Sequence, residues 1–383
     1  MAKHLAAQPE KKRISPIKVI LKLVLCVLLV AVAAVGSYVA YLSITYYRID
    51  DGVSLDVTGP ATAEAAQIEV GQPYTAVTYN IGFGAYVPDF SFFMETGVMA
   101  DGTATRGASG TASSEDVVHF STDGVIGTLQ QLDPDFIIAQ EVDVDSTRSY
   151  HVDQCAALMG AFPTYQAVFA SNFHSGFLAY PFHDMHGSVQ SGLLTLSSVQ
   201  VSSATRRSYP IDESFPWKFF DLDRCFSVTR IPTSDGHELV LVNTHMSAYD
   251  EGGVYRAKQL DLMLGFLTAE RAAGNYVIAG GDWNHALAGS RELYPSAAAA
   301  PDWVATFDDD LLPEGFSVVR AENLEDVATC RGSDMPYEPG VSYEVTVDGF
   351  IVSDNVSATA VNVDAGFAYS DHNPVLLTFE LVG

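Results

Sequence analysis

The chain has 383 residues, enough for one large domain or two ordinary ones, and 48% of them are hydrophobic, so a sizeable core can form. Charged residues make up only 17%, yet the formal net charge is −27. Beyond a basic N-terminal segment, the remainder carries 14 bases and 46 acids, a formal charge of −32. So acidic a body repels polyanions, which argues against a protein that holds DNA in a broad basic groove.

The N-terminal region has the pattern of a membrane anchor. Residues 23–47 contain no charged residue, and about 20 apolar residues suffice to cross the hydrocarbon layer as a helix. Basic residues in segment 1–22 precede this stretch and Asp50 follows it. The positive-inside tendency therefore predicts a single-pass protein of the cell membrane with a cytoplasmic N-terminus and an extracytoplasmic body. The alternative is a signal peptide cleaved near Ala34 and Gly36, which would give a secreted protein.

The rest of the chain divides into a short linker and one domain. Residues 48–72 show no clear hydrophobic period and are interpreted as a stalk. From 73 to 383, short apolar runs alternate with helical patterns, which predicts a single α/β domain, with a mobile insertion at 97–115. The expected elements are, in chain order, a strand at 74–79, a helix ending at 132, strands at 136–139, 192–196, 226–231 and 239–243, a helix at 255–273, and strands at 276–279, 345–352 and 375–381.

Polar residues recur at the ends of these strands. A carboxylate at one strand end is usually part of a turn or a helix cap, so no single ending is informative. Because the strand ends of a sheet converge on one edge, however, the whole set can form a single cleft. The endings are Asn80 in TYN, Glu141 in FIIAQE, His245 in LVLVNTH, Asp282 and Asn284 in YVIAGGDWN, Asp348 in VTVDGF, and Asp371 and His372 in YSDHNP.

These residue types suit the hydrolysis of a phosphoester. A phosphodiester repels nucleophiles, so a cation of the Mg²⁺ class must neutralise its oxygens. Hard cations prefer oxygen ligands, which Glu141 and Asn80 supply. A His fixed by a carboxylate orients and deprotonates water near neutral pH, and Asp348 with His372 can form this pair. His245 can stabilise charge on the leaving oxygen.

The ordered set TYN, QE, NTH, GGDWN, VDGF and SDHNP resembles the endonuclease/exonuclease/phosphatase superfamily over residues 73–383. This superfamily includes deoxyribonucleases, abasic-site endonucleases, sphingomyelinases and inositol-polyphosphate 5-phosphatases. GDWN and SDHNP are its most specific pieces here. The resemblance implies an α/β (α+β) fold, a four-layer α/β/β/α sandwich of two packed mixed sheets, preceded in this chain by one transmembrane helix.

The resemblance also implies a metal site. Glu141 is similar to the family's main metal ligand, with Asn80 beside it. Asp371 resembles a carboxylate that supports the metal or binds a second one. The implied cofactor is Mg²⁺, with Mn²⁺ or Ca²⁺ as alternatives, and whether one or two ions bind stays open.

The same comparison implies catalytic roles. Asp282 resembles the residue that positions or deprotonates the attacking water, and Asn284 the one that contacts this Asp and the phosphate. His372, oriented by Asp348, resembles the His that contacts the scissile phosphate and is often assigned as the base. His245 is similar to the first catalytic His of the deoxyribonuclease and sphingomyelinase branches. The choice of base between Asp282 and His372 stays open.

Three further residues are expected to bind substrate. Arg224 begins a strand that leads to the cleft in this family and can hold a phosphate through two hydrogen bonds, the alternative being an ion pair with a neighbouring Asp. Tyr180 and His183 belong to the segment 172–187, which mixes aromatic and His residues. This segment is expected to form a loop that faces the substrate.

The sequence thus predicts a membrane-anchored, extracytoplasmic, metal-dependent phosphoester hydrolase, either a phosphodiesterase or a phosphatase. The substrate is a lipid head group or a nucleic acid, and no protein partner is predicted. One alternative is an extracellular nuclease that acts on DNA or RNA. Another is a non-catalytic surface binding module on the same scaffold.

Overall fold

The computed structural model describes residues 15–248 and 250–382. It divides into two compact units, of which the first ends at Tyr46 and the second begins at Tyr47. The predicted basic segment 1–22 falls largely outside the described residues, because these begin at residue 15.

The described part of the first unit is one long helix, α1 (Pro16–Thr45). Its apolar side chains are almost all exposed, and its length and composition suffice to cross a membrane, although a signal sequence meets the same criteria. The helix begins seven residues before the predicted apolar stretch. Pro16 suits a first helical turn, and Lys18 and Lys22 are good helix formers. The helix therefore includes charged residues that the predicted range excluded, because that range was defined by the absence of charge.

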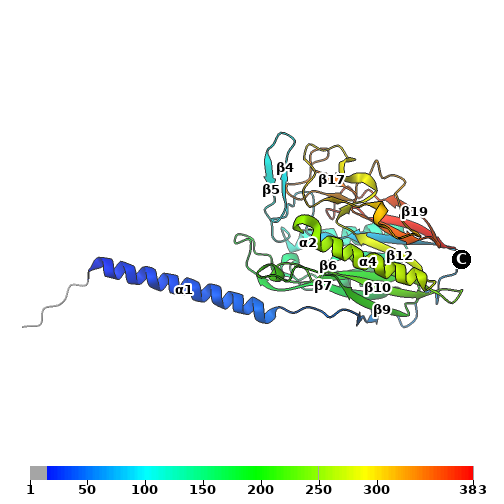
Figure 1. Ribbon diagram of the computed structural model, residues 1–383, viewed down its shortest axis with the longest axis horizontal. Coiled ribbons are helices and arrows are strands. Elements are labelled where there is room, and N and C mark those ends of the chain that lie inside the picture. The colour runs from blue at the N-terminus through cyan, green and yellow to red at the C-terminus, as the bar shows by residue number, and fades with distance from the viewer. Residues whose placement is uncertain (1–14, 249, 383) are drawn as a thin grey trace, which may run out of the picture. The chain divides into compact units, whose positions relative to one another are not determined.

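The second unit contains two seven-stranded sheets (Figure 1). In each sheet one pair of neighbouring strands is parallel and the others are antiparallel, so both sheets are mixed. The first sheet has the order β1 (Val53–Ser54), β9 (Ser203–Ser208), β10 (Cys225–Pro232), β11 (Glu238–His245), β12 (Tyr276–Asp282), β18 (Asp348–Ser353) and β15 (Phe316–Val318). The second has the order β19 (Val356–Asn362), β20 (Val375–Leu381), β3 (Pro73–Asn80), β6 (Phe136–Asp143), β8 (Gly187–Ser197), β7 (Gln166–Leu178) and β2 (Val57–Thr58).

Three apolar clusters hold the sheets and helices together in layers. Between the sheets, Ile138 of β6 and Leu241 of β11 share one fully buried cluster. Helix α4 (Val254–Ala272) packs on the outer face of the first sheet, and helices α2 (Glu115–Leu132) and α3 (Gln154–Ala161) pack on the outer face of the second. Alternate residues of a strand point to opposite faces, so each sheet serves two of these clusters. The four-layer α/β/β/α sandwich is therefore confirmed.

Shorter elements fill the connections. Single turns of 3-10 helix occur at Gly82–Gly84, Thr147–Ser149, Trp217–Phe219, Glu251–Gly253, Leu287–Glu292 and Asp309–Leu311. The small strand pairs are β4 (Thr96–Val98) with β5 (Ala104–Arg106), β13 (His285–Ala286) with β14 (Ala305–Thr306), and β16 (Cys330–Arg331) with β17 (Glu344–Val345). The region predicted as a mobile insertion thus contains the β4–β5 hairpin, and the Thr105 hydroxyl of this hairpin donates a hydrogen bond to Asp334.

The structure also differs from the predicted stalk at 48–72. This segment supplies two edge strands, since β1 pairs with β9 and β2 pairs with β7. Ile68 is fully buried in the cluster between the sheets. Strands of two residues are too short to show an alternating pattern in the sequence, and edge pairing depends on backbone hydrogen bonds. The segment therefore belongs to the second unit for much of its length.

Candidate active site

Three neighbouring strands of the first sheet bring charged side chains into one row. The register pairs His245 at the end of β11 with Asp282 at the end of β12, and Asp282 with Asp348 at the start of β18. Residues directly opposite each other on neighbouring strands carry their side chains side by side on one face. All three are buried, and the His245 Nε2 atom lies 3.4 Å from the Asp282 Oδ2 atom.

The second sheet contributes Asn80 and Glu141 from its parallel strands β3 and β6. The register shifts between Ala139 and Val142, and Glu141 within this irregularity has a positive φ of 54°. Such irregularities re-aim a side chain, and unfavourable backbone conformations gather at functional sites. The Asn80 Nδ2 atom donates hydrogen bonds to Glu141 at 3.2 Å and to Asp282 at 3.0 Å. Asn80 therefore links carboxylates from both sheets.

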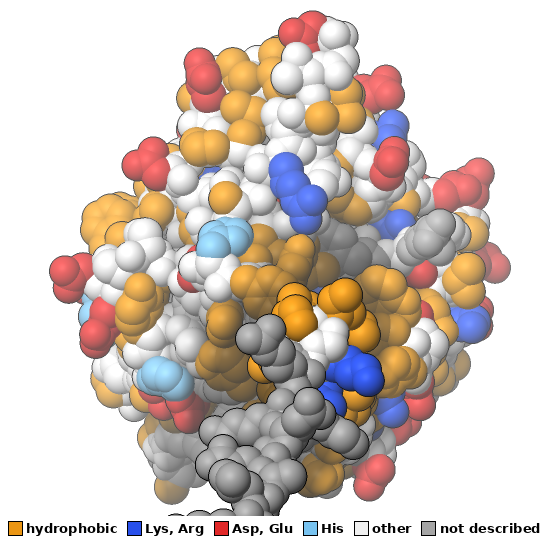
Figure 2. Space-filling view, turned by 90° about the vertical axis from the view of Figure 1, so that its left-hand side faces the viewer, with side chains coloured by type: hydrophobic (Ala, Val, Ile, Leu, Met, Phe, Trp, Pro, Cys, Tyr) orange, Lys and Arg blue, Asp and Glu red, His pale blue; other side chains and the backbone are white. Residues whose placement is uncertain are grey.

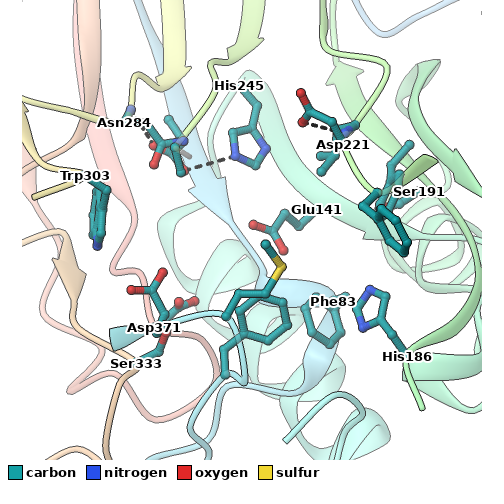
Figure 3. A pocket seen from close by; sticks show the side chains of 18 of the residues that line it. Phe83, Glu141, His186, Ser191, Asp221, His245, Asn284, Trp303, Ser333 and Asp371 are labelled. Atoms are coloured by element: carbon teal, nitrogen blue, oxygen red, sulfur yellow. Dashed lines mark hydrogen bonds and ion pairs between the residues drawn. The ribbon is translucent and has the colours of Figure 1, made fainter. Parts of the chain in front are cut away.

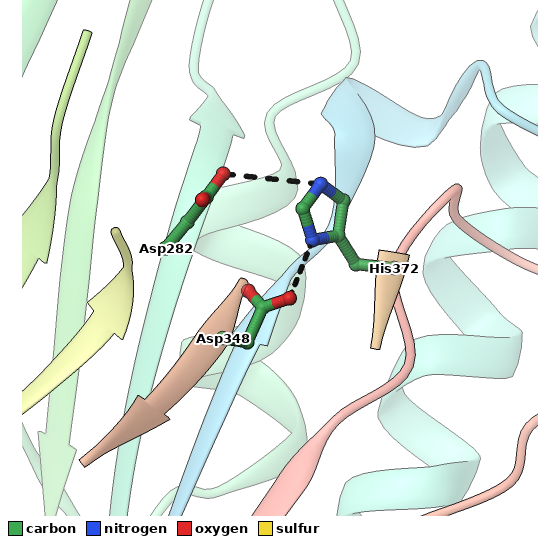
Figure 4. A group of neighbouring side chains, drawn as sticks. All are labelled: Asp282, Asp348 and His372. Carbon is green, nitrogen blue, oxygen red and sulfur yellow. Dashed lines mark hydrogen bonds and ion pairs between the residues drawn. The ribbon is translucent and has the colours of Figure 1, made fainter. Parts of the chain in front are cut away.

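The turn before β20 supplies His372 and Asp371. The His372 Nδ1 atom hydrogen-bonds the Asp348 carboxylate at 2.7 Å, and its Nε2 atom lies 3.8 Å from the Asp282 carboxylate (Figure 4). The Ser370 hydroxyl fixes this turn, because it donates to the Asn80 carbonyl at 2.8 Å and accepts the His372 N–H at 3.1 Å. The imidazole is thus held between two carboxylates from neighbouring strands.

The two active-site His residues have opposite charge preferences. Burial alone would lower the pKa of His372, but the bonded Asp348 carboxylate outweighs burial, so this pKa is raised well above its usual value. The pKa of His245 is lowered well below its usual value, chiefly by burial and then by the Arg224 charge. Burial also raises the pKa of Asp282 to about 6. Near neutral pH the site therefore combines a charged His372, a neutral His245 and a carboxylate that can exchange a proton.

Asn284 supports the Asp282 carboxylate from the loop after β12. Its backbone N–H donates to the Asp282 Oδ1 atom at 2.9 Å, and its side-chain amide donates to the Met246 carbonyl at 2.8 Å. The φ of Asn284 is 49°, a left-handed conformation that Asn tolerates better than most residues. The side chain lines the same cavity as Asp282.

The donor set fits a hard divalent cation beside Glu141. Burial raises the pKa of Asp371 to about 6, and the nearby negative charge of Glu141 contributes in the same direction. Two carboxylates that repel each other at the wall of a cavity gain stability when a cation lies between them. Asp282, Asp348 and His372 also offer ligand atoms within 4.8 Å of one another. There, however, a cation would have to displace the 2.7 Å hydrogen bond of His372, so the Glu141 side of the site is the better match.

A cavity of about 780 Å³ lies beside this group, and its lining includes Glu141, His245, Asp282, Asn284, Asp371 and His372 (Figure 3). Glu141, Asp371 and His245 point into it in that view. Of the residues expected to bind substrate, Arg224 and Tyr180 line the cavity. His183 is exposed, is not part of the lining, and has its Nε2 atom 2.9 Å from the Ala108 carbonyl.

Sequence reasoning missed several residues of the cavity wall. Arg148 is buried, forms two hydrogen bonds with Asp143, and stacks 3.8 Å above the ring centroid of Phe83. Arg331 is also buried and donates to the carbonyls of Tyr86 and Val87. Both lie outside the six motifs, and an isolated Arg in a sequence does not reveal that it is buried. The charges of Arg148 and Arg331 add positive potential to the cavity. The body around this cavity is acidic, and Figure 2 shows acidic side chains spread around the margin of one face.

Comparisons with known proteins agree with this geometry. Residues 77–372 match the model of the Endonuclease/Exonuclease/phosphatase family. A search of curated proteins found no match. An endonuclease/exonuclease/phosphatase from Beutenbergia cavernae DSM 12333 is similar in structure, with a TM-score of 0.55 and 14% identity over 82% of this chain and 72% of that one.

Two other solved structures resemble the chain at lower TM-scores. Truncated TDP2 from Caenorhabditis elegans gives 0.49 with 15% identity, over 81% of this chain and 98% of that one. ANGEL2, described as a 2',3'-cyclic phosphatase, gives 0.49 with 13% identity, over 85% and 98%. The family-model match covers most of the chain, and the two sheets have the expected layers. This chain therefore belongs to the Endonuclease/Exonuclease/phosphatase family, whose members are hydrolases that act on phosphoester bonds.

Proposed function

We propose that this protein is a divalent-cation-dependent phosphoester hydrolase, anchored by α1 with its catalytic domain, the second unit, on the extracytoplasmic side of a membrane. The observation that carries the proposal is the convergence of the strand-end residues from both sheets on one cavity. Every position named from the motifs holds a chemically competent residue, which disfavours a non-catalytic binding module.

In this proposal Glu141 and Asp371 hold the cation, with Asn80 beside them through the second lone pair of its amide oxygen, since Gly82 N–H occupies the first. Mg²⁺ is the expected ion, and Mn²⁺ or Ca²⁺ are alternatives. The bound cation would neutralise the phosphate oxygens and so lower the barrier to attack by water.

The remaining residues orient the water and stabilise charge. Asp282 would accept the proton of the attacking water, because a pKa of about 6 lies close to the working pH. His372, kept protonated by Asp348, would donate a hydrogen bond to a phosphate oxygen. Neutral His245 would donate one N–H to the leaving oxygen. Asn284 and Arg224, which line the same cavity, would contact the phosphate.

The test is hydrolysis of bis-p-nitrophenyl phosphate and p-nitrophenyl phosphate by the full chain in detergent, with Mg²⁺, Mn²⁺, Ca²⁺ or EDTA. Even residues that only support a metal ligand contribute ~10–100-fold, so Glu141→Gln should lower cation-dependent turnover by more than ~100-fold. Glu325→Gln is the matched control, because Glu325 is an exposed carboxylate that forms an ion pair with Arg320. It should leave turnover unchanged.

Two outcomes would count against the proposal. Full, EDTA-sensitive turnover by Glu141→Gln would show that the cation lies elsewhere. Absence of hydrolysis by the parent chain with every cation and both esters would favour the binding module.

A further inference from the structure

The cavity changes character from its floor to its mouth. The carboxylates and imidazoles of the site lie in the buried and half-buried part of its lining, whereas Tyr180, Trp217 and Phe220 of the same lining are exposed. The rings of Phe93 and Tyr180 lie 5.6 Å apart, centroid to centroid, and contact edge to face. The same cavity therefore contains both the reactive groups and exposed aromatic side chains.

Exposed aromatic side chains surround this mouth. Two segments carry them, one that includes the end of β7 and the residues after it, and one around the turn at Trp217–Phe219. Phe182 is 80% exposed, Phe215 64% and Trp217 62%, although rings of this size normally have at least one face buried. We call this set the aromatic rim; its members are Phe177, Tyr180, Phe182, Phe215, Trp217 and Phe220. Exposed apolar patches of this kind mark contact with a membrane or another macromolecule.

The polypeptide enters the second unit beside this rim. The Tyr47 ring stacks on His174 of β7 at a centroid distance of 3.8 Å. Arg48 forms ion pairs with Glu213 at 2.5 Å and with Asp223 at 3.0 Å, and these two residues flank the segment that carries Phe215, Trp217 and Phe220. The first residues of the domain are thus fixed to both segments that form the rim.

The chain between the apolar helix and the second unit is short. Helix α1 ends at Thr45 and the second unit begins at Tyr47, so only Tyr46 lies between them. The second unit therefore begins two residues after a helix that is long and apolar enough to cross a membrane.

The charges at the mouth indicate what does not enter. Asp212, Asp221 and Asp250 of the cavity lining are partly exposed, whereas the Arg residues of the same lining are buried. A nucleic acid strand carries a phosphate on every nucleotide and binds mainly through neutralisation of these charges by Lys and Arg. Three carboxylates at the mouth of an already acidic body oppose such a strand. A single phosphoester followed by an apolar group meets no such conflict, because its phosphate would reach the buried Arg224 and its apolar part would face aromatic walls.

From these observations we propose that the aromatic rim inserts into the lipid interface of a membrane and that the cavity takes the phosphoester head group of a membrane lipid. This inference rests on the proposed hydrolase function and specifies its substrate class. Aromatic side chains are the residues that favour the interface between head groups and acyl chains, and they need no basic surface to bind there.

The first experiment tests the position of the rim. The full chain is reconstituted in phosphatidylcholine vesicles with or without bromine atoms near the top of the acyl chains, and tryptophan emission is compared. Of the three Trp side chains, Trp217 is 62% exposed, Trp283 is fully buried, and Trp303 is half-buried in the cavity lining, so the comparison with Trp217→Phe isolates the signal of Trp217 from that of the other two. We expect brominated lipid to quench the parent, and Trp217→Phe, which keeps an aromatic ring at the rim, to lose most of this quenching. Equal quenching of parent and variant would place Trp217 outside the lipid and overturn the proposal.

The second experiment separates lipid access from chemistry. The double variant Phe182→Ser/Phe215→Ser is assayed in proteoliposomes on vesicle lipids and on bis-p-nitrophenyl phosphate. The vesicles contain phosphatidylcholine, phosphatidylethanolamine, sphingomyelin or phosphatidylinositol phosphates. Burying a large apolar side chain contributes ~1.5 kcal/mol or more, so each loss should lower lipid hydrolysis roughly tenfold. Hydrolysis of the soluble diester should stay within about twofold of the parent, because neither side chain lines the deep end of the cavity.

Leu311→Ser is the matched control. Leu311 is 55% exposed and does not line the cavity, so both activities should be unchanged. Equal loss of both activities in the rim variant, or loss of neither, would refute docking. A parent chain that hydrolyses the soluble diester and a DNA oligonucleotide but none of the vesicle lipids would refute the lipid substrate and leave the hydrolase proposal standing. A parent that hydrolyses no ester would refute the hydrolase proposal itself.

Discussion

His186 offers a quantitative test of how the cavity wall contributes to stability. This residue is 5% exposed, and the rings of Phe83, Phe92, Phe93 and Phe173 lie around it. The pKa of His186 is lowered to about 4, first by burial and then by the charge of Arg148, although Asp143 and Asp184 act in the opposite direction. The folded state therefore holds this imidazole neutral over a pH range in which the unfolded chain protonates it.

The sign and size of the effect follow from this difference. Between pH 6.5 and 4 the unfolded state binds more protons at this position than the folded state, so stability falls as the pH falls. A shift from 6.5 to about 4 corresponds to roughly 3 kcal/mol, since each pKa unit is ~1.4 kcal/mol. The contribution is complete near pH 6.5 and above, and it is lost as the pH falls toward 4.

The substitution His186→Asn isolates this contribution. The His186 Nδ1 atom lies 2.7 Å from the Gly110 carbonyl, and the amide nitrogen of Asn can donate to the same oxygen. The variant loses ring packing at every pH, but it has no group to protonate. Urea unfolding of both chains in detergent at several pH values gives the free energy of unfolding.

We expect the parent to lose roughly 3 kcal/mol more than His186→Asn between pH 6.5 and 4. Other carboxylates titrate in this range in both chains, so their contributions cancel in the difference. Parallel pH profiles for parent and variant would refute the reasoning, because they would mean that His186 is protonated equally in the folded and unfolded states.

Three further predictions concern the site and its support. Asp348→Asn removes the carboxylate that orients His372 and should lower kcat for bis-p-nitrophenyl phosphate ~10²–10⁴-fold with little change in circular dichroism; a kcat within threefold of the parent would contradict the pairing. Gly281→Ala should lower the free energy of unfolding in urea by about 3 kcal/mol, because a Cβ atom on residue 281, whose φ is +147°, would lie 2.0 Å from the Thr244 carbonyl oxygen. A loss below ~1 kcal/mol would show that the strand adjusts to the added Cβ atom. Burial raises the pKa of the thiols of Cys155, Cys225 and Cys330 to about 12, so these thiols should react with iodoacetamide at pH 8 only after unfolding. Mass spectrometry can show the modification, and rapid modification of the folded chain would argue against their burial.

Much of the sandwich could be predicted because its central strands carry long apolar runs. Strands β3, β6, β10, β11, β12 and β20 all overlap expected ranges, and the predicted residues Glu141, His245 and Asp282 line one cavity. Asp282 and Asp348 illustrate why: each follows or begins a buried run, so its position at the edge of a sheet is fixed by the run itself. Strand β7 was missed, since its sequence QAVFASNFHSGFL mixes buried and half-buried residues without a clear period.

The parts that the sequence could not supply depend on contacts between distant segments. Arg148 carries no motif, and its place in the cavity wall follows from its pairing with Asp143 and its stacking on Phe83. The docking of Arg48 on Asp223 is similar, because the two residues are 175 positions apart. Segment 48–72 was interpreted as a stalk for the same reason, as only the folded structure reveals its edge pairing.

The pairing of His245, Asp282 and Asp348 across three strands has an evolutionary consequence. Their spacing is set by the backbone ladder, which tolerates no insertion or deletion within β11, β12 or β18 without turning a side chain to the opposite face. The connecting segments that shape the entrance are under no such restriction. Chemistry and selectivity can therefore diversify separately, with the reactive row inherited unchanged while neighbouring loops are rebuilt for new ligands.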